Sequence, residues 1–101
     1  MTIWDGAPTR TRSAPRTRTV PVVIYGNRWC GITQLIRRAL DRAGVGYDYV
    51  DLDDHPSVHA RLEALTGGRL RTPVVHIDGE WLMEPSLRQV QAVLARHGVR
   101  L

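Results

Sequence analysis

Hydrophobic residues in the first half of the chain alternate between short continuous runs and helical spacing. The run Val20–Tyr25 predicts a strand covered on both faces, and Tyr47–Leu52 predicts a second one. Between them, apolar residues recur three or four positions apart until Gly44, which predicts an amphipathic helix that ends there. The segment thus predicts a β-α-β unit with two parallel strands. The predicted inner face of this helix consists of Ile32, Leu35, Ile36, Ala39, Leu40 and Ala43.

A second helix is predicted to begin near Pro56, because proline is favoured in the first helical turn. Asp53 or Asp54 is expected to cap it, and Gly67-Gly68 to stop it. Its apolar positions are few, so the helix is expected to bury one narrow face, made of Val58, Leu62 and Leu65.

Two strands, Pro73–Ile77 and Glu80–Met83, flank Asp78-Gly79, which is a strong signal for a two-residue hairpin. The last helix is predicted to start at Ser86, since Gln89 three residues later completes a capping box. Its predicted inner face consists of Leu87, Val90, Val93, Leu94 and His97.

The predicted element order is therefore β-α-β-α-β-β-α, in which a parallel half precedes an antiparallel half. This order predicts an α/β fold with a four-stranded mixed sheet and three helices, which is the minimal form of the thioredoxin fold. The folded domain is expected to span residues 20–101, and residues 1–19 to form a disordered arm.

Composition supports one soluble globular domain: 43% of the 101 residues are hydrophobic and 24% are charged. No run suits a membrane span or a signal peptide, and one cysteine precludes an internal disulfide, so a reducing cytoplasm is expected. The net charge is +4, and every basic residue is arginine. Much of that excess lies in the arm, which is interpreted as solvating rather than as binding nucleic acid.

Cys30 is the first candidate for chemistry, because it stands where the first strand meets the first helix. The unpaired N–H groups and the positive dipole of a helix start favour a thiolate over a thiol. Arg28 could add positive charge, and the Thr33 hydroxyl, one turn on, could donate to the sulfur. The alternative is a small buried hydrophobic residue.

Thr72-Pro73 is the second candidate, because a proline at a strand start gives no N–H to the sheet. A cis bond there would leave the backbone of Thr72 able to pair with an extended thiol ligand. From the residues alone, an ordinary trans proline remains open.

Residues 20–97 resemble the glutaredoxin family, and within it the actinobacterial mycoredoxins. The resemblance lies in Trp29-Cys30-Gly31, in Tyr47–Asp51, in Gly67-Gly68 followed by Pro73, and in Asp78-Gly79. It implies a cis Thr72-Pro73 bond.

The active-site motif departs from that of the family, whose usual Cys-x-x-Cys is here Cys30-Gly31-Ile32-Thr33. The resemblance therefore implies a monothiol oxidoreductase that reduces mixed disulfides between proteins and a small thiol, with Cys30 as the nucleophile and Thr33 assisting it. Two alternatives are a monothiol glutaredoxin that shares a [2Fe–2S] cluster across a dimer, and a binding module without turnover.

The small thiol, mycothiol or glutathione, is expected to be bound around Cys30 by a monomer. Glu84 lies in Met83-Glu84-Pro85-Ser86, where glutathione-using relatives carry Gly-Gly-x-Asp. This departure weakens a glutathione assignment, and the resemblance to mycoredoxins implies a mycothiol-like thiol. The expected binding residues are Arg28, Trp29, Gly31, Ile32, Arg71, Thr72, Pro73 and Glu84, with Arg69 nearby.

Other chemistry-bearing residues are interpreted as structural. His55 and His59 are four residues apart near two aspartates, but a solvent-facing helix surface explains them better than a metal site. His76 and Trp81 are expected to pack in or against the sheet.

Overall fold

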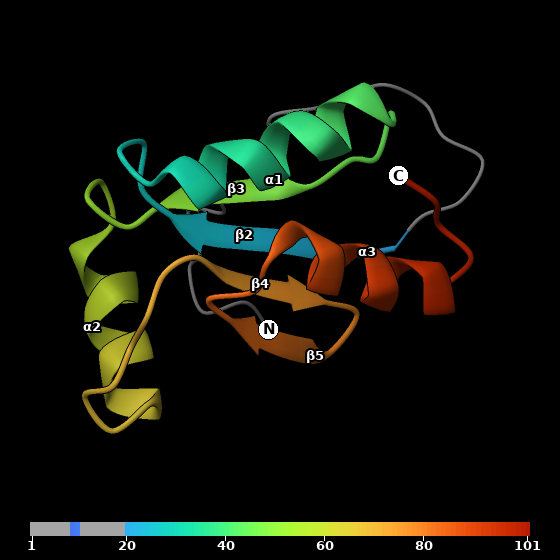
Figure 1. Cartoon of the computed structure of the whole chain (residues 1–101). Coiled ribbons are helices and arrows are strands. Elements are labelled where there is room, and N and C mark those ends of the chain that lie inside the picture. The colour runs from blue at the N-terminus through green and yellow to red at the C-terminus, as the bar shows by residue number, and fades with distance from the viewer. Residues whose placement is uncertain (1–8, 11–19) are drawn as a thin grey trace.

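The computed structural model describes residues 9–10 and 20–101, which form one five-stranded sheet with three helices (Figure 1). The spatial strand order is β1-β3-β2-β4-β5; β2 and β3 are parallel, and the other neighbours are antiparallel. The elements are β1 (Thr9–Arg10), β2 (Val22–Gly26), α1 (Gly31–Arg42), β3 (Asp48–Asp51), α2 (Pro56–Leu65), β4 (Val74–Ile77), β5 (Glu80–Met83) and α3 (Leu87–Arg96).

The predicted α/β thioredoxin-type order is confirmed in β2 to β5 and the three helices. Two residues of the expected N-terminal arm, Thr9–Arg10, form the additional edge strand β1 against β3. The rest of that arm lies outside the described residues.

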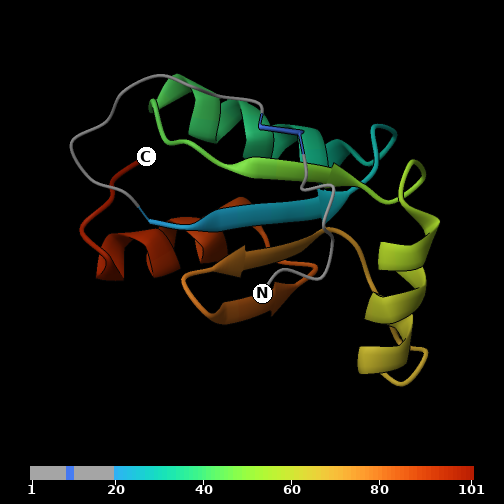
Figure 2. The same ribbon diagram turned by 180° about the vertical axis from the view of Figure 1, so that it is seen from behind.

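The sheet separates two hydrophobic clusters. On one face, α1 and α3 pack over alternate residues of β2 and β4; Ile24 and Val75 are paired in the sheet and completely buried there. On the other face, α2 packs against Tyr25, Val50 and Val74. This helix lies at the end of the sheet where β2 and β3 finish, as Figure 1 and the reverse view in Figure 2 show.

Three local predictions were wrong. The α2 N-cap is His55, and no side chain forms a capping hydrogen bond, so neither Asp53 nor Asp54 caps the helix. Leu65 is 69% exposed, because α2 covers only one end of its face of the sheet. In α1, Ile32 and Leu35 are 43% and 41% exposed, and the inward row runs instead through Thr33, Ile36 and Leu40.

The turn and the helix cap predicted for the C-terminal half are both present in the structure. Asp78 and Gly79 both have positive φ, 47° and 90°, as the two-residue hairpin requires. Ser86 Oγ accepts a hydrogen bond from Gln89 N at 3.1 Å, and Ser86 N donates to Gln89 Oε1 at 2.8 Å, which confirms the capping box. Among the described residues, no helix combines the length and apolar character needed to cross a bilayer.

Candidate active site

Cys30 is the N-cap residue of α1, at the end of the loop that leaves β2. A tight turn holds this loop: Cys30 N donates to Asn27 O at 3.2 Å, and Trp29 N donates to Asn27 Oδ1 at 3.2 Å. The thiol is half-buried, at the point where the helix presents its unpaired N–H groups. The predicted position of Cys30 at the start of the helix is confirmed.

Thr33 is completely buried beneath Cys30 in the first turn of α1. Its Oγ1 has no nitrogen or oxygen partner within the part of the chain that the structure describes. A buried hydroxyl without a partner is costly, so such an atom calls for an explanation. The Thr33 hydroxyl lowers the pKa of the neighbouring Cys30 thiol, which gives this otherwise unpartnered group a use at the site.

The glycine at the end of β2 makes room for Thr33. A Cβ atom on Gly26 would lie 2.5 Å from Thr33 Oγ1 and 2.9 Å from its Cγ2. The strand and the helix can therefore approach this closely only because residue 26 has no side chain. Gly26 was not singled out from the sequence, and its position at the end of the β2 run is the signal that could have found it.

Opposing effects act on the pKa of the Cys30 thiol. Burial is the largest and raises it, and the negative charge of Glu84 raises it further. The Thr33 hydroxyl and the backbone N–H groups of Thr33 and Ile32 lower it, because these groups favour the thiolate. Together the donors prevail, so the pKa of Cys30 lies below its ordinary value of 9.0.

The second wall of the site is formed by Thr72-Pro73 and Glu84. The Thr72-Pro73 peptide bond is cis, as the family resemblance implied. Glu84 has a positive φ of 53°, and its N–H donates to Pro73 O at 2.7 Å. Arg71 Nη1 lies 3.3 Å from Glu84 Oε1. Arg71, the cis-proline and Glu84 are thus held together, and the Glu84 charge acts on Cys30.

A family model of glutaredoxin matches residues 12–82. The chain belongs to the glutaredoxin family. No curated protein matches the chain. Three similar solved structures share the fold, and each match covers 72% of this chain. The thioredoxin-like protein BC3987, solved as a point mutant, is 23% identical with a TM-score of 0.63 and is covered to 97%. NrdH-redoxin from Escherichia coli is 19% identical with a TM-score of 0.62 and is covered to 93%, and a glutaredoxin from Archaeoglobus fulgidus is 18% identical with a TM-score of 0.60 and is covered to 84%.

Arg28 in this glutaredoxin-family site pairs with two carboxylates, one at the end of β3 and one in the loop that follows it. Its Nε lies 3.3 Å from Asp51 Oδ2, and its Nη2 lies 3.0 Å from Asp54 Oδ2. The hydrogen bond to Asp51, with the charges of Asp51 and Asp54, raises the pKa of Arg28. Two carboxylates therefore engage the guanidinium, and Asp51 is the residue that sequence reasoning missed.

The remaining predicted binding residues border Cys30 on its exposed side. Trp29 is 82% exposed, so most of its indole is open to a ligand or client. Gly31 and Ile32 are exposed in the first turn of the helix, and Thr72 is half-buried.

The histidines lie in structural positions. His55 Nδ1 lies 3.0 Å from Asp51 O, and His59 Nε2 lies 3.7 Å from Glu63 Oε2 within α2. Among the described residues, no group of three or more His, Cys, Asp or Glu side chains could hold a metal ion. His76 stacks on Trp81 with ring centroids 4.2 Å apart, and burial lowers the pKa of His76. The expected packing role of His76 and Trp81 is confirmed.

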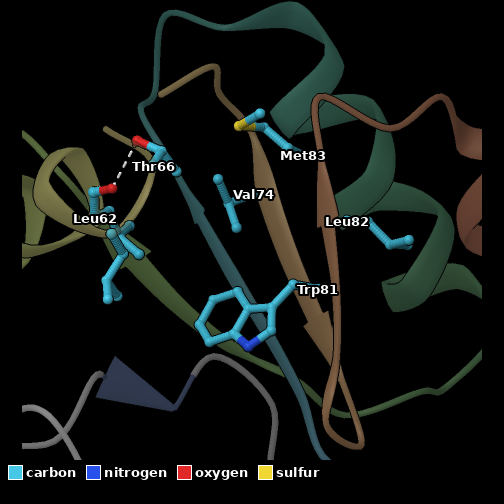
Figure 3. Close-up of a pocket in the computed structure, with 7 residues that line it drawn as sticks. Leu62, Thr66, Val74, Trp81, Leu82 and Met83 are labelled. Carbon is cyan, nitrogen blue, oxygen red and sulfur yellow. Dashed lines mark hydrogen bonds between the residues drawn. The ribbon is translucent and has the colours of Figure 1, made fainter. Parts of the chain in front are cut away.

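An apolar groove of about 360 Å³ lies between α2 and the β4-β5 hairpin, as Figure 3 shows. Trp81 forms one wall, 51% exposed and stacked on Tyr25 at 5.9 Å between ring centroids. The groove has no reactive group, so it is not part of the thiol chemistry. Its lining residues are Leu62, Leu65, Thr66, Val74, Trp81, Leu82 and Met83.

Proposed function

We propose that this glutaredoxin-family protein is a monothiol thiol–disulfide oxidoreductase that reduces mixed disulfides between proteins and a low-molecular-weight thiol. One observation carries the proposal: a completely buried hydroxyl, that of Thr33, lies one helical turn after Cys30 and lowers the pKa of its thiol, at the position where dithiol relatives have a resolving cysteine. Cys30 is the only cysteine in the chain, so any disulfide exchange must use a partner thiol.

The reaction needs two exchanges. In the first, the Cys30 thiolate attacks the small-thiol sulfur of the mixed disulfide; that S–S bond breaks, and the client leaves as a thiolate that takes up a proton. Cys30 then carries the small thiol in a new disulfide. In the second exchange, another small thiol, as its thiolate, attacks that adduct, releasing the oxidised small-thiol dimer and the Cys30 thiolate. The net reaction therefore consumes one free small thiol and yields the client thiol and the oxidised small-thiol dimer, whose other half comes from the mixed disulfide.

This chain's residues have distinct tasks in these exchanges. The Thr33 hydroxyl and the N–H groups at the start of α1 stabilise negative charge on the Cys30 sulfur when it attacks and when it leaves. Thr72 and Pro73 form the wall along which an extended thiol ligand would lie, and Trp29 offers it a flat apolar surface.

A mycothiol-like thiol is the proposed co-substrate, as in the mycoredoxins that the sequence resembles. Glu84 supports this choice, because its carboxylate at the site repels a second carboxylate, which glutathione would bring. Hydroxyl groups on the small thiol would instead donate to the Glu84 carboxylate or accept from the Arg71 guanidinium. We place the reaction in the reducing cytoplasm and on a monomer.

The test is turnover of a model peptide that carries mycothiol or glutathione in a mixed disulfide, with the same free thiol as reductant. The wild type is expected to release free peptide and to accumulate a Cys30 adduct of the small thiol, detected by intact mass. Cys30→Ser must abolish both, and Thr33→Ser must retain them. Equal turnover by Cys30→Ser would refute the proposal. A brown protein with a cluster-dependent dimer after anaerobic purification, and no turnover, would instead support the [2Fe–2S] alternative.

A further inference from the structure

The loop that carries Cys30 is tied to a second loop by a buried carboxylate. Gly26 and Asp51 are partners in the parallel β2-β3 pairing, and Leu52 N donates to Gly26 O at 2.8 Å. The two loops that leave these strands, residues 27–30 and 52–55, therefore start side by side. One carries the nucleophile, and the other has no reactive group of its own.

Asp51 is at the centre of this junction, and only 7% of its surface is exposed. Its Oδ1 accepts from Asp53 N at 2.9 Å, and its Oδ2 accepts from Arg28 Nε and from Tyr49 Oη, each at 3.3 Å. Burial, followed by the charge of Asp51, raises the pKa of Tyr49 to about 12, so its hydroxyl remains a donor at neutral pH. A buried charge is tolerated when it is paired in this way.

Arg28 passes this constraint to the active-site loop, because it lies two residues before Cys30. The guanidinium also pairs with Asp54, but the Asp54 side chain is 59% exposed whereas that of Asp51 is 9% exposed. An exposed ion pair fixes geometry weakly, and a largely buried, multiply bonded carboxylate fixes it strongly. Asp54 is thus a matched control for Asp51: it has the same charge and the same partner, Arg28, but it holds that side chain less firmly.

We propose that Asp51 is a positioning residue which, through Arg28, holds the residue 27–30 loop so that the Cys30 thiol stays at the start of α1. The inference rests on the proposed role of Cys30 as a nucleophile. It concerns how the thiolate is stabilised, so it can be tested with a small alkylating agent without any disulfide substrate.

An electrostatic effect and a positioning effect of Asp51 predict opposite shifts in the pKa of the Cys30 thiol. Removing a carboxylate near a thiol, or freeing Arg28 to approach it, lowers the pKa of the thiol by electrostatics. Loosening the loop withdraws the sulfur from its donors and raises that pKa. Other charged groups around the sulfur, Glu84 and its partner Arg71, are unchanged in these variants. The sign of the change therefore separates the two mechanisms.

The experiment follows iodoacetamide alkylation of Cys30 against pH by intact mass in wild type, Asp51→Asn and Asp54→Asn. We expect Asp51→Asn to shift the midpoint upward and to slow alkylation at pH 7 by about tenfold, a change typical of a lost charge-assisted hydrogen bond. Asp54→Asn should stay within about twofold of wild type. An equal effect of the two variants, or a downward shift in Asp51→Asn, overturns the proposal.

A second variant covers the case in which Asp51→Asn does not fold. Arg28→Lys keeps the positive charge but removes the guanidinium that joins the two loops, so it must reproduce the upward shift, whereas a charge effect alone would leave the midpoint unchanged. Where both single variants fold, the double variant must be alkylated no more slowly than the slower single variant, because both substitutions break the same connection. Additive effects would overturn a role through Arg28. Failure of the turnover test with unchanged alkylation results would refute the proposed function alone.

Discussion

Replacing Thr33 with valine should make the protein more stable and its cysteine less reactive. The change exchanges a hydroxyl for a methyl group of nearly the same shape at a site with no exposed surface. Because the hydroxyl has no nitrogen or oxygen partner among the described residues, its burial is a cost that valine avoids. The Cys30 sulfur, in contrast, loses a donor that lowers its pKa.

The size of the expected stability change follows from the burial of the Thr33 hydroxyl. A hydroxyl buried without a conventional partner costs about 1–3 kcal/mol, and the lower end applies here because the thiol is a weak partner. We expect Thr33→Val to gain about 1 kcal/mol at pH 5, or about 4–8 °C in Tm for a domain of this size. The pKa of Cys30 should rise, and alkylation at pH 7 should slow several-fold.

Thermal unfolding at pH 5 and alkylation at pH 7 measure the two effects, with Thr33→Ser as the matched control. Serine keeps the hydroxyl and removes a buried methyl group, so this variant should lose about 1 kcal/mol and keep its reactivity. The two substitutions therefore change stability in opposite directions, and only Thr33→Val slows alkylation. A Thr33→Val variant that is less stable, with unchanged alkylation, would refute the assignment of the hydroxyl to the sulfur.

Three further predictions concern stability. Gly26→Ala should cost about 1–3 kcal/mol in urea unfolding, because its Cβ would lie 2.5 Å from Thr33 Oγ1. Gly31→Ala is the control and should not destabilise, because there is open space around the new atom. Equal effects of the two variants would contradict this reasoning. Ser86→Ala should cost about 1 kcal/mol, measured by the same method, because it breaks the α3 capping box; an unchanged midpoint would show that the cap contributes little. The folded pKa of Cys30 is lowered, so its stabilisation is complete above the ordinary value of 9.0 and is lost as pH falls through the folded pKa. The stability difference between wild type and Cys30→Ser should therefore rise with pH in that interval; a flat difference would contradict the lowered pKa.

Much of the fold could be predicted because local signals and burial agree. The Asp78-Gly79 turn and the Ser86 capping box each need a few adjacent residues, and both form as predicted. Helical periodicity predicted the extent of α1 and two residues of its inward face, Ile36 and Leu40, but at the start of the helix Thr33 is buried in place of Ile32. Polarity alone cannot anticipate a buried threonine whose partner is a sulfur.

The candidate site was predictable only in part. Cys30 and Thr33 are close in sequence, so one turn of helix brings them together. The cis Thr72-Pro73 bond followed from the family resemblance and not from proline chemistry. Arg28 meets Asp51 across 23 positions, through strand pairing that residue patterns do not specify in detail. The connection between the two loops is visible only in the structure.

The most direct test of the central claim is the pH midpoint of Cys30 alkylation in the folded protein, measured against the same chain unfolded in urea. The single cysteine makes the assignment unambiguous by intact mass. If α1 and Thr33 stabilise the thiolate, the folded midpoint lies below the unfolded one. A folded midpoint equal to or above the unfolded one would contradict a role for Cys30 as an activated nucleophile.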